Sequence, residues 1–136
     1  MLLDENSSRE LIINYIKYFS HHFLHYSSDK PWAQPYIDEA AKISAREESF
    51  YFLFNFSDAT WAQPYIDEAA KNAARNSPFG FLSNLSGKPW AQPYIDDAVK
   101  SAAKKYPEYF LEKWADRFPH HINLALFALG SKNVSK

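Results

Sequence analysis

Between residues 60 and 76 the apolar positions follow the period of an α-helix. Two aromatic residues and an alanine stand four residues apart, and a stripe of alanines and an isoleucine runs beside them. Together the two stripes form the broad apolar face of an amphipathic helix. The first stripe is Trp61, Tyr65 and Ala69, and the second is Ala62, Ile66, Ala70 and Ala74.

The ends of this helix are also marked in the sequence. Thr60 followed by Gln63 matches the T-x-x-Q capping pattern of a helix start. We expect the helix to end near Asn76. Ser77 then predicts the cap of a second, shorter helix that has Pro78 at its first position. The segment therefore predicts a helical hairpin.

The hairpin is one of several copies. WAQPYIDEAAK starts at Trp32 and again at Trp61, and WAQPYIDDAVK starts at Trp90, so both steps are 29 residues. A fixed period of this length is typical of stacked repeats. We expect an all-α fold, a single-domain α-solenoid of about four hairpins. Its predicted parts are a degenerate N-terminal unit (1–29), repeats at 30–58, 59–87 and 88–116, and a C-terminal capping helix with a tail (117–136).

The same 29-residue step can be carried onto the two ends. Residues Arg9 to Tyr26 are expected to form two helices or one continuous helix. Glu108 to Arg117 predicts a short second helix of a hairpin. His120 to Leu129 predicts a final helix that Gly130 terminates.

Two resemblances follow from these motifs. The hairpin plan resembles the tetratricopeptide and HEAT classes of helical repeat, although the tetratricopeptide period is longer, about 34 residues. Phe56-Ser57-Asp58 followed by Trp61 to Ile66 is similar to the opening of the S-layer homology motif, a bacterial wall-anchoring module. That motif continues with glycines, which residues 71–76 lack. The first resemblance implies stacked helices, and neither implies an activity.

Composition narrows the function classes. The formal net charge is -1, which does not favour nucleic acid or an anionic membrane as a partner. There is no cysteine, which excludes a disulfide or a thiolate site. No signal peptide and no stretch of about 18 apolar residues is evident, so we expect a cytoplasmic protein.

The repeated aromatic pairs are predicted to be core. A Trp and a Tyr four residues apart bury a large apolar area between stacked hairpins, and the alternative is a ladder on which ligands stack. Under the core interpretation Trp61→Ala is expected to cost about 3–5 kcal/mol. The predicted structural core is Trp32, Tyr36, Trp61, Tyr65, Trp90 and Tyr94.

Two repeated polar rows are the candidate partner-binding residues. If the hairpins stack in register, one glutamine and one aspartate per repeat form parallel lines on one surface. Repeat proteins that read RNA use such rows, whereas recent duplication alone would also produce them. The rows are Gln34, Gln63 and Gln92, and Asp38, Asp67 and Asp96.

Candidate chemistry is sparse. His21 and His25, four residues apart on a helix, could hold one metal ion, but the H-E-x-x-H arrangement of metalloproteases is absent. The acidic pairs such as Asp67-Glu68 are adjacent in sequence and so point about 100° apart on a helix. We therefore predict no enzyme, no cofactor and no resident metal.

The functional prediction is a scaffold that binds a protein or peptide partner, because stacking creates an extended surface. A self-associating structural module, a homo-oligomer built through exposed aromatic residues, is the alternative. A reader of single-stranded RNA that uses the Gln and Asp rows is a second alternative, which the charge disfavours.

Overall fold

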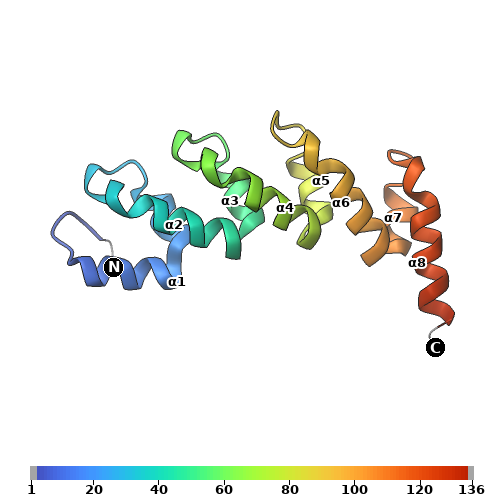
Figure 1. The fold of residues 1–136 in the computed structure, drawn as a ribbon, viewed down its shortest axis with the longest axis horizontal. Helices are drawn as coiled ribbons and strands as arrows, with labels where there is room; N and C mark the ends of the chain where they lie inside the picture. The colour runs from blue at the N-terminus through green and yellow to red at the C-terminus, as the bar shows by residue number, and fades with distance from the viewer. Residues whose placement is uncertain (1–2, 135–136) are drawn as a thin grey trace. The chain divides into compact units, whose positions relative to one another are not determined.

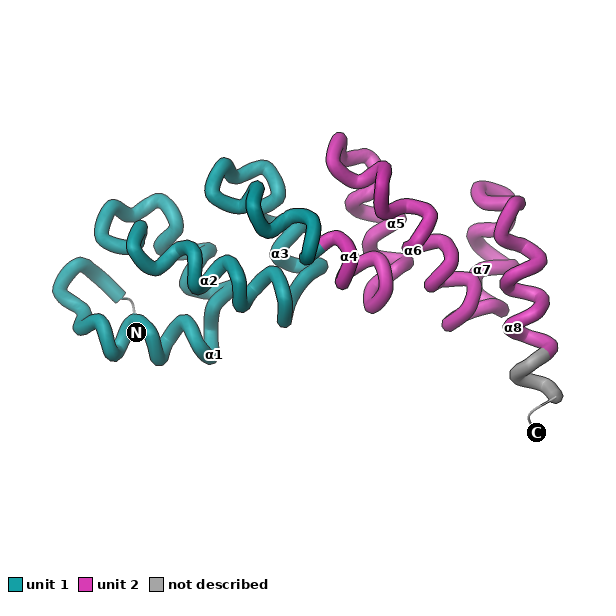
Figure 2. The backbone as a smooth tube through the Cα atoms, viewed as in Figure 1, with its two compact units in different colours: residues 1–69 teal, residues 70–136 magenta. Residues whose placement is uncertain are grey.

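A computed structural model describes residues 3–134 of the chain. All the regular structure in that range is helical, and no strand occurs in it, which confirms the all-α prediction. The helices belong to two compact units, residues 1–69 and residues 70–136 (Figure 2). The boundary between the units lies inside one helix, α4 (Ile66–Asn76).

Unit 1 is built around a central helix. Its elements are α1 (Arg9–Ser27), η1 (Pro31–Ala33), α2 (Gln34–Glu47), α3 (Ser49–Phe56), η2 (Thr60–Tyr65) and the first turn of α4. Helix α2 packs on α1 and on α3 (Figure 1). The small side chains of α2 allow this close approach. The core of the unit includes Phe23, Leu24, Ala40, Ala41, Phe52 and Leu53, all with no more than 1% of their surface exposed.

Unit 2 is also built around a central helix, α6 (Gln92–Lys105), on which other helices pack. After the end of α4 come α5 (Pro78–Asn84), α6, α7 (Pro107–Lys113), η3 (Pro119–His121) and α8 (Ile122–Val134). Helix α6 packs against α5, α7 and α8. The core includes Phe81, Leu82, Ala98, Ala102, Ala103 and Phe110, again at most 1% exposed.

The helix junctions recur at the interval seen in the sequence. Phe19, Glu48, Ser77 and Tyr106 are 29 residues apart, and their φ angles lie between -138° and -130° with ψ between 44° and 60°. Ser77 and Tyr106 precede proline, which disfavours helical backbone. Phe19 lies inside α1, where it produces a kink. The open choice for Arg9 to Tyr26 is thus resolved as two helical segments within α1, which meet at the non-helical Phe19.

Each of three copies also contains the same ring contact. The pairs Phe23–Trp32, Phe52–Trp61 and Phe81–Trp90 all have centroids 6.1 Å apart and meet edge-on, at 76°, 68° and 71°. In each pair the phenylalanine is fully buried and the tryptophan is half-buried.

The aromatic residues predicted as core are therefore not the most deeply buried ones. The repeated tryptophans and their partners Tyr36, Tyr65 and Tyr94 are half-buried, at the edge of the core. The reason is that each tryptophan covers a phenylalanine edge-on, while the alanine that follows it points inward. The large side chains at the centre are instead Phe23, Phe52, Phe81 and Phe110.

The predicted capping box at Thr60 is wrong. The cap residue of η2 is Ala59, and no side chain caps it. Because the first turn is a 3₁₀-helix, Gln63 lies beside the preceding loop, and its Nε2 donates to the carbonyls of Ser57 and Ala59 at 3.0 and 2.9 Å. Gln34 does the same to Ser28 and Lys30, at 3.0 and 2.9 Å. In both repeats the glutamine side chain thus connects the preceding loop to the start of the helix through hydrogen bonds. Ser77, the predicted cap of α5, likewise makes no side-chain cap hydrogen bond, although α5 does begin at Pro78.

Removing this connection should destabilise the fold moderately. We expect Gln63→Ala to lower the free energy of unfolding by about 1–2 kcal/mol, because the Ser57 carbonyl loses the amide donor and the Ala59 carbonyl keeps only its bond from the Ala62 N–H. Urea unfolding followed by circular dichroism measures the change. Glu39→Ala, at an exposed site on α2, is the control and should be neutral. If Gln63→Ala unfolds at the same urea concentration as the parent, the loop does not depend on these bonds.

The C-terminal helix differs from its prediction. Gly130 does not end it, since α8 continues to Val134. A glycine ends a helix when it adopts positive φ, and no described glycine does so. The short helix predicted over Glu108 to Arg117 is α7, which ends earlier, at Lys113. No helix within the described range is long and apolar enough to cross a bilayer.

Candidate binding site

The kink in α1 brings large apolar side chains to the surface of unit 1. Tyr18, Phe19 and Tyr26 are 71%, 56% and 51% exposed. Such a group of exposed rings on one element is typical of an interaction site rather than of an ordinary surface. We call this set, together with the other residues that line the two cavities described next, the α1 aromatic site.

A wide, open cavity of about 750 Å³ lies over the kink. Helix α1 supplies nearly all of its lining, and Glu48, the junction residue between α2 and α3, supplies the single carboxylate. The lining residues are Tyr15, Tyr18, Phe19, His21, His22, Tyr26 and Glu48.

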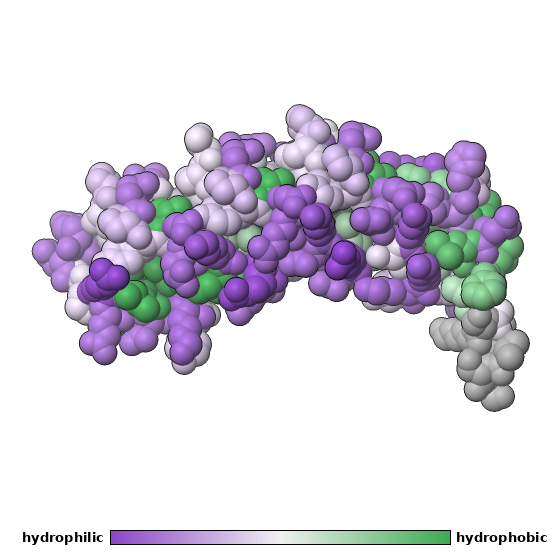
Figure 3. Space-filling view, viewed as in Figure 1, coloured by the Kyte–Doolittle hydropathy of each residue, from purple (hydrophilic) through white to green (hydrophobic). Residues whose placement is uncertain are grey.

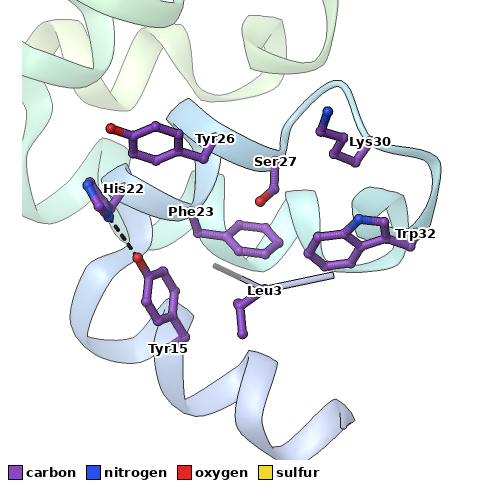
Figure 4. Close-up of a pocket in the computed structure, with 8 residues that line it drawn as sticks. All are labelled: Leu3, Tyr15, His22, Phe23, Tyr26, Ser27, Lys30 and Trp32. Carbon is purple, nitrogen blue, oxygen red and sulfur yellow. Dashed lines mark hydrogen bonds between the residues drawn. The ribbon is translucent and has the colours of Figure 1, made fainter. Parts of the chain in front are cut away.

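A smaller cavity of about 240 Å³ lies next to it (Figure 4). Tyr15, His22 and Tyr26 line both cavities, so they form the wall between them. The Tyr15 hydroxyl and His22 Nδ1 are hydrogen-bonded at 2.7 Å, which holds two of these rings in place. The lining residues are Leu3, Tyr15, His22, Phe23, Tyr26, Ser27, Lys30 and Trp32.

His21 anchors the wall of the open cavity to the other helices. Its Nδ1 is 3.5 Å from Ser44 Oγ on α2, and its Nε2 is 3.3 Å from Asn55 Nδ2 on α3. Its ring packs on that of Phe56, with centroids 5.0 Å apart. Burial lowers the pKa of His21 below 6.5, and the nearby charge of Glu48 only partly offsets this. The neutral imidazole is therefore the form that this packing favours.

This pKa shift gives unit 1 a pH dependence. Because the pKa of His21 is lower in the folded than in the unfolded chain, its contribution to stability is complete above about pH 6.5 and is lost as pH falls through the folded-state pKa. We expect a lower melting temperature at pH 5 than at pH 7.5, with part of the difference removed by His21→Gln. His120→Gln, at an exposed site in unit 2, is the control. Equal pH dependence in the parent and His21→Gln would contradict this assignment.

The candidate metal pair, His21 and His25, has other contacts in the structure. Both ring nitrogens of His21 face side chains of α2 and α3, while the exposed His25 packs edge-on against Tyr26, with centroids 4.7 Å apart. Among the residues that the structure describes, no three His, Asp or Glu side chains converge as metal ligands.

The predicted polar rows have unequal surroundings. Gln34 and Gln63 are bonded to their loops as described above. Asp38 pairs with Lys42 at 3.1 Å, whereas Asp96 contacts both Lys100 at 2.9 Å and His121 at 3.0 Å. The hydrogen bond from Lys100, and then that from His121, lowers the pKa of Asp96. Gln92 and Asp67 are exposed. Asp96 thus helps hold η3 on α6, in addition to facing solvent.

No sequence pattern pointed to Tyr15, Tyr18, Phe19 or Tyr26 as site residues. They could have been found because the N-terminal unit, residues 1–29, departs from the residues at the equivalent positions of the later repeats. Where that copy has Tyr15, His22 and Tyr26, the third copy has Ala73, Gly80 and Asn84.

Comparison of the chain with protein-family models, curated proteins and solved structures found no match.

Proposed function

We propose that the chain is a helical-repeat scaffold that binds a peptide segment with apolar side chains at the α1 aromatic site. The observation that carries this is the exposure of Tyr18, Phe19 and Tyr26, each more than half exposed, around an open cavity. Tyrosine and other large rings are enriched among the residues that dominate binding energy at interfaces.

The architecture that we propose for this scaffold is an α-solenoid with a 29-residue period. It is supported by the junction residues, which share one backbone geometry at that spacing, and by the three equivalent Phe–Trp contacts. Stacked hairpins bury a continuous core and leave each copy free to vary its outer face. The first copy is the one with the most aromatic outer face.

The rigidity of the site favours recognition of an apolar segment. Tyr15 is held by His22, and His21 is held by Ser44 and Asn55, so several rings are already positioned. A preorganised surface loses less conformational entropy on binding. Exposed rings gain most by covering apolar side chains of a partner.

A display selection tests the proposal. A random peptide library is selected on the parent protein, and the enriched peptides are measured by calorimetry against Tyr18→Ser, Phe19→Ser and a control, Tyr109→Ser. Tyr109 is exposed too, but it lies on α7 in unit 2. We expect a consensus with apolar residues and a loss of affinity of tenfold or more in the α1 variants only. The absence of enrichment, or equal affinity in all variants, would overturn the proposal.

A second candidate function is self-association through α8. Phe127 is 74% exposed and Leu126 is 50% exposed, and Figure 3 shows hydrophobic atoms at the surface near that end of the chain. At the position of Phe127 the preceding copies have Ala40, Ala69 and Ala98, which are fully buried. Sedimentation should then show a dimer or larger species that Phe127→Ser returns to monomer. A parent that is monomeric at high concentration would exclude this function.

A further inference from the structure

The small cavity of the α1 aromatic site lies at a repeat position that carries a small side chain only in the N-terminal unit. That position is occupied by Phe56, Leu85 and Trp114 in the later copies and by Ser27 in the first. Phe56 is 8% exposed and packs on Trp61 with centroids 5.3 Å apart, and Leu85 is fully buried. Ser27 is also buried, at 6% exposure, but its side chain is much smaller. The unfilled volume is the cavity next to Trp32.

The cavity is large enough for a ring. Its volume is about 240 Å³, and an apolar cavity of about 150 Å³ is known to hold benzene. Phe23 and Trp32 meet edge-on along one side, Tyr15 stands opposite, and Leu3 closes the space between them (Figure 4). These walls favour a planar, apolar group, because aromatic rings pack well edge-on or offset against one another.

The polar atoms at the cavity favour a negative charge. Among the described residues that line the cavity, Lys30 is the one with a full charge, and none carries a carboxylate. Asp29, next to Lys30 in sequence, does not line the cavity. Lys30 is exposed, and it makes no ion pair among the bridges of the described residues. The Ser27 hydroxyl, which points toward Phe23 in Figure 4, can also donate to an anion.

We propose that this cavity binds a planar apolar group that carries a carboxylate, with the ring between Phe23, Trp32 and Tyr15 and the carboxylate at the Lys30 ammonium. The inference goes beyond the peptide-binding function, because a free aromatic acid fits the site as well as the end of a peptide does. Charge complementarity at Lys30 sets the sign of the ligand's charge, and the small side chain of Ser27 leaves the space for its ring.

The test is an NMR titration with phenylacetate, and with phenethylamine as a probe of similar size and opposite charge. The amide signals near Ser27 and the indole signal of Trp32 report binding. We expect phenylacetate to bind with a dissociation constant on the order of 1 mM or tighter, as for a good ligand of ten heavy atoms. Phenethylamine should bind at least tenfold more weakly. Equal affinity for the two probes, or binding of neither, would overturn the proposal.

Matched variants separate the two parts of the site. Lys30→Gln should remove the preference for phenylacetate, whereas Lys88→Gln, at the equivalent position two repeat steps further along the chain, should leave it unchanged. Ser27→Leu, which introduces the side chain found at Leu85, should abolish binding and raise the melting temperature. Lys30→Gln changes an exposed residue and so tests the site even if Ser27→Leu alters the fold. Unchanged binding in Lys30→Gln or in a folded Ser27→Leu variant would contradict the assignment.

The source of the carboxylate is a separate question for the same assay. A short peptide ending in phenylalanine is compared with its C-terminal amide. Tighter binding of the free acid than of both the amide and phenylacetate identifies a peptide C-terminus as the natural ligand chemistry, and tighter binding of phenylacetate identifies a free acid. Peptide selection can fail while phenylacetate binds, so failure of the peptide-binding function is distinguishable from failure of this site.

Discussion

Phe52→Ala is expected to destabilise the protein by about 3–5 kcal/mol, the usual penalty for removing a large aromatic side chain from a core. The Phe52 side chain is fully buried, and its ring contacts those of Phe56 and Trp61, at centroid distances of 5.9 and 6.1 Å. The truncated residue leaves a cavity that alanine-rich helices cannot fill, since their side chains are too short to move into it. Urea unfolding followed by the helical circular dichroism signal measures the loss.

The same helix offers a matched control. Phe54 is two residues away on α3 and is 55% exposed. Phe54→Ala should therefore change the free energy of unfolding by only a small fraction of the Phe52→Ala effect. If both variants lose the same stability, burial in the described core does not determine the contribution of these rings.

Trp61→Ala should have the second largest effect, about 3 kcal/mol, at the lower end of the range for large aromatic residues. The indole ring is only half-buried, but it covers both Phe52 and Phe56, with centroids 6.1 and 5.3 Å away. Its removal exposes two phenylalanine edges to water in addition to losing its own buried area. Thermal and urea unfolding are the measurements.

A double-mutant cycle checks that the contact carries part of this loss. Because Trp61 and Phe52 touch, the two alanine changes together should cost less than the sum of the separate changes, by about 0.5–1.5 kcal/mol. Trp61→Phe keeps a ring at the site and should recover part of the stability. Strict additivity of the two alanine variants would show that the edge-on contact contributes nothing.

Self-association through α8 should respond to other substitutions than the stability of the fold does. Phe127 is exposed on α8, so Phe127→Ser should leave the urea midpoint of the monomer nearly unchanged while it alters the mass measured by sedimentation. The stability variants of α3 and η2 should leave any association through α8 unchanged, because they lie in unit 1.

Local patterns were sufficient to predict the helices and their spacing. The apolar stripes and the proline at the start of α5 predicted helices, and all the regular structure of the described residues is helical. These features are local, because helical periodicity and proline restriction act within a few residues. The capping box failed because the first turn is a 3₁₀-helix, whose geometry turns Gln63 toward the preceding loop.

Which side chains reach the centre was decided only by the tertiary structure. Sequence periodicity placed Trp61 and Ala62 on neighbouring stripes of one apolar face, but it could not tell which of them would be fully covered, because that depends on the neighbouring helices. The same is true of the cavity at Ser27. A serine in the sequence becomes an unfilled space only because Phe23, Trp32 and Tyr15 are held around it by contacts between α1, α2 and their loop. Packing between helices is long-range, so it is specified by the whole fold and not by any one segment.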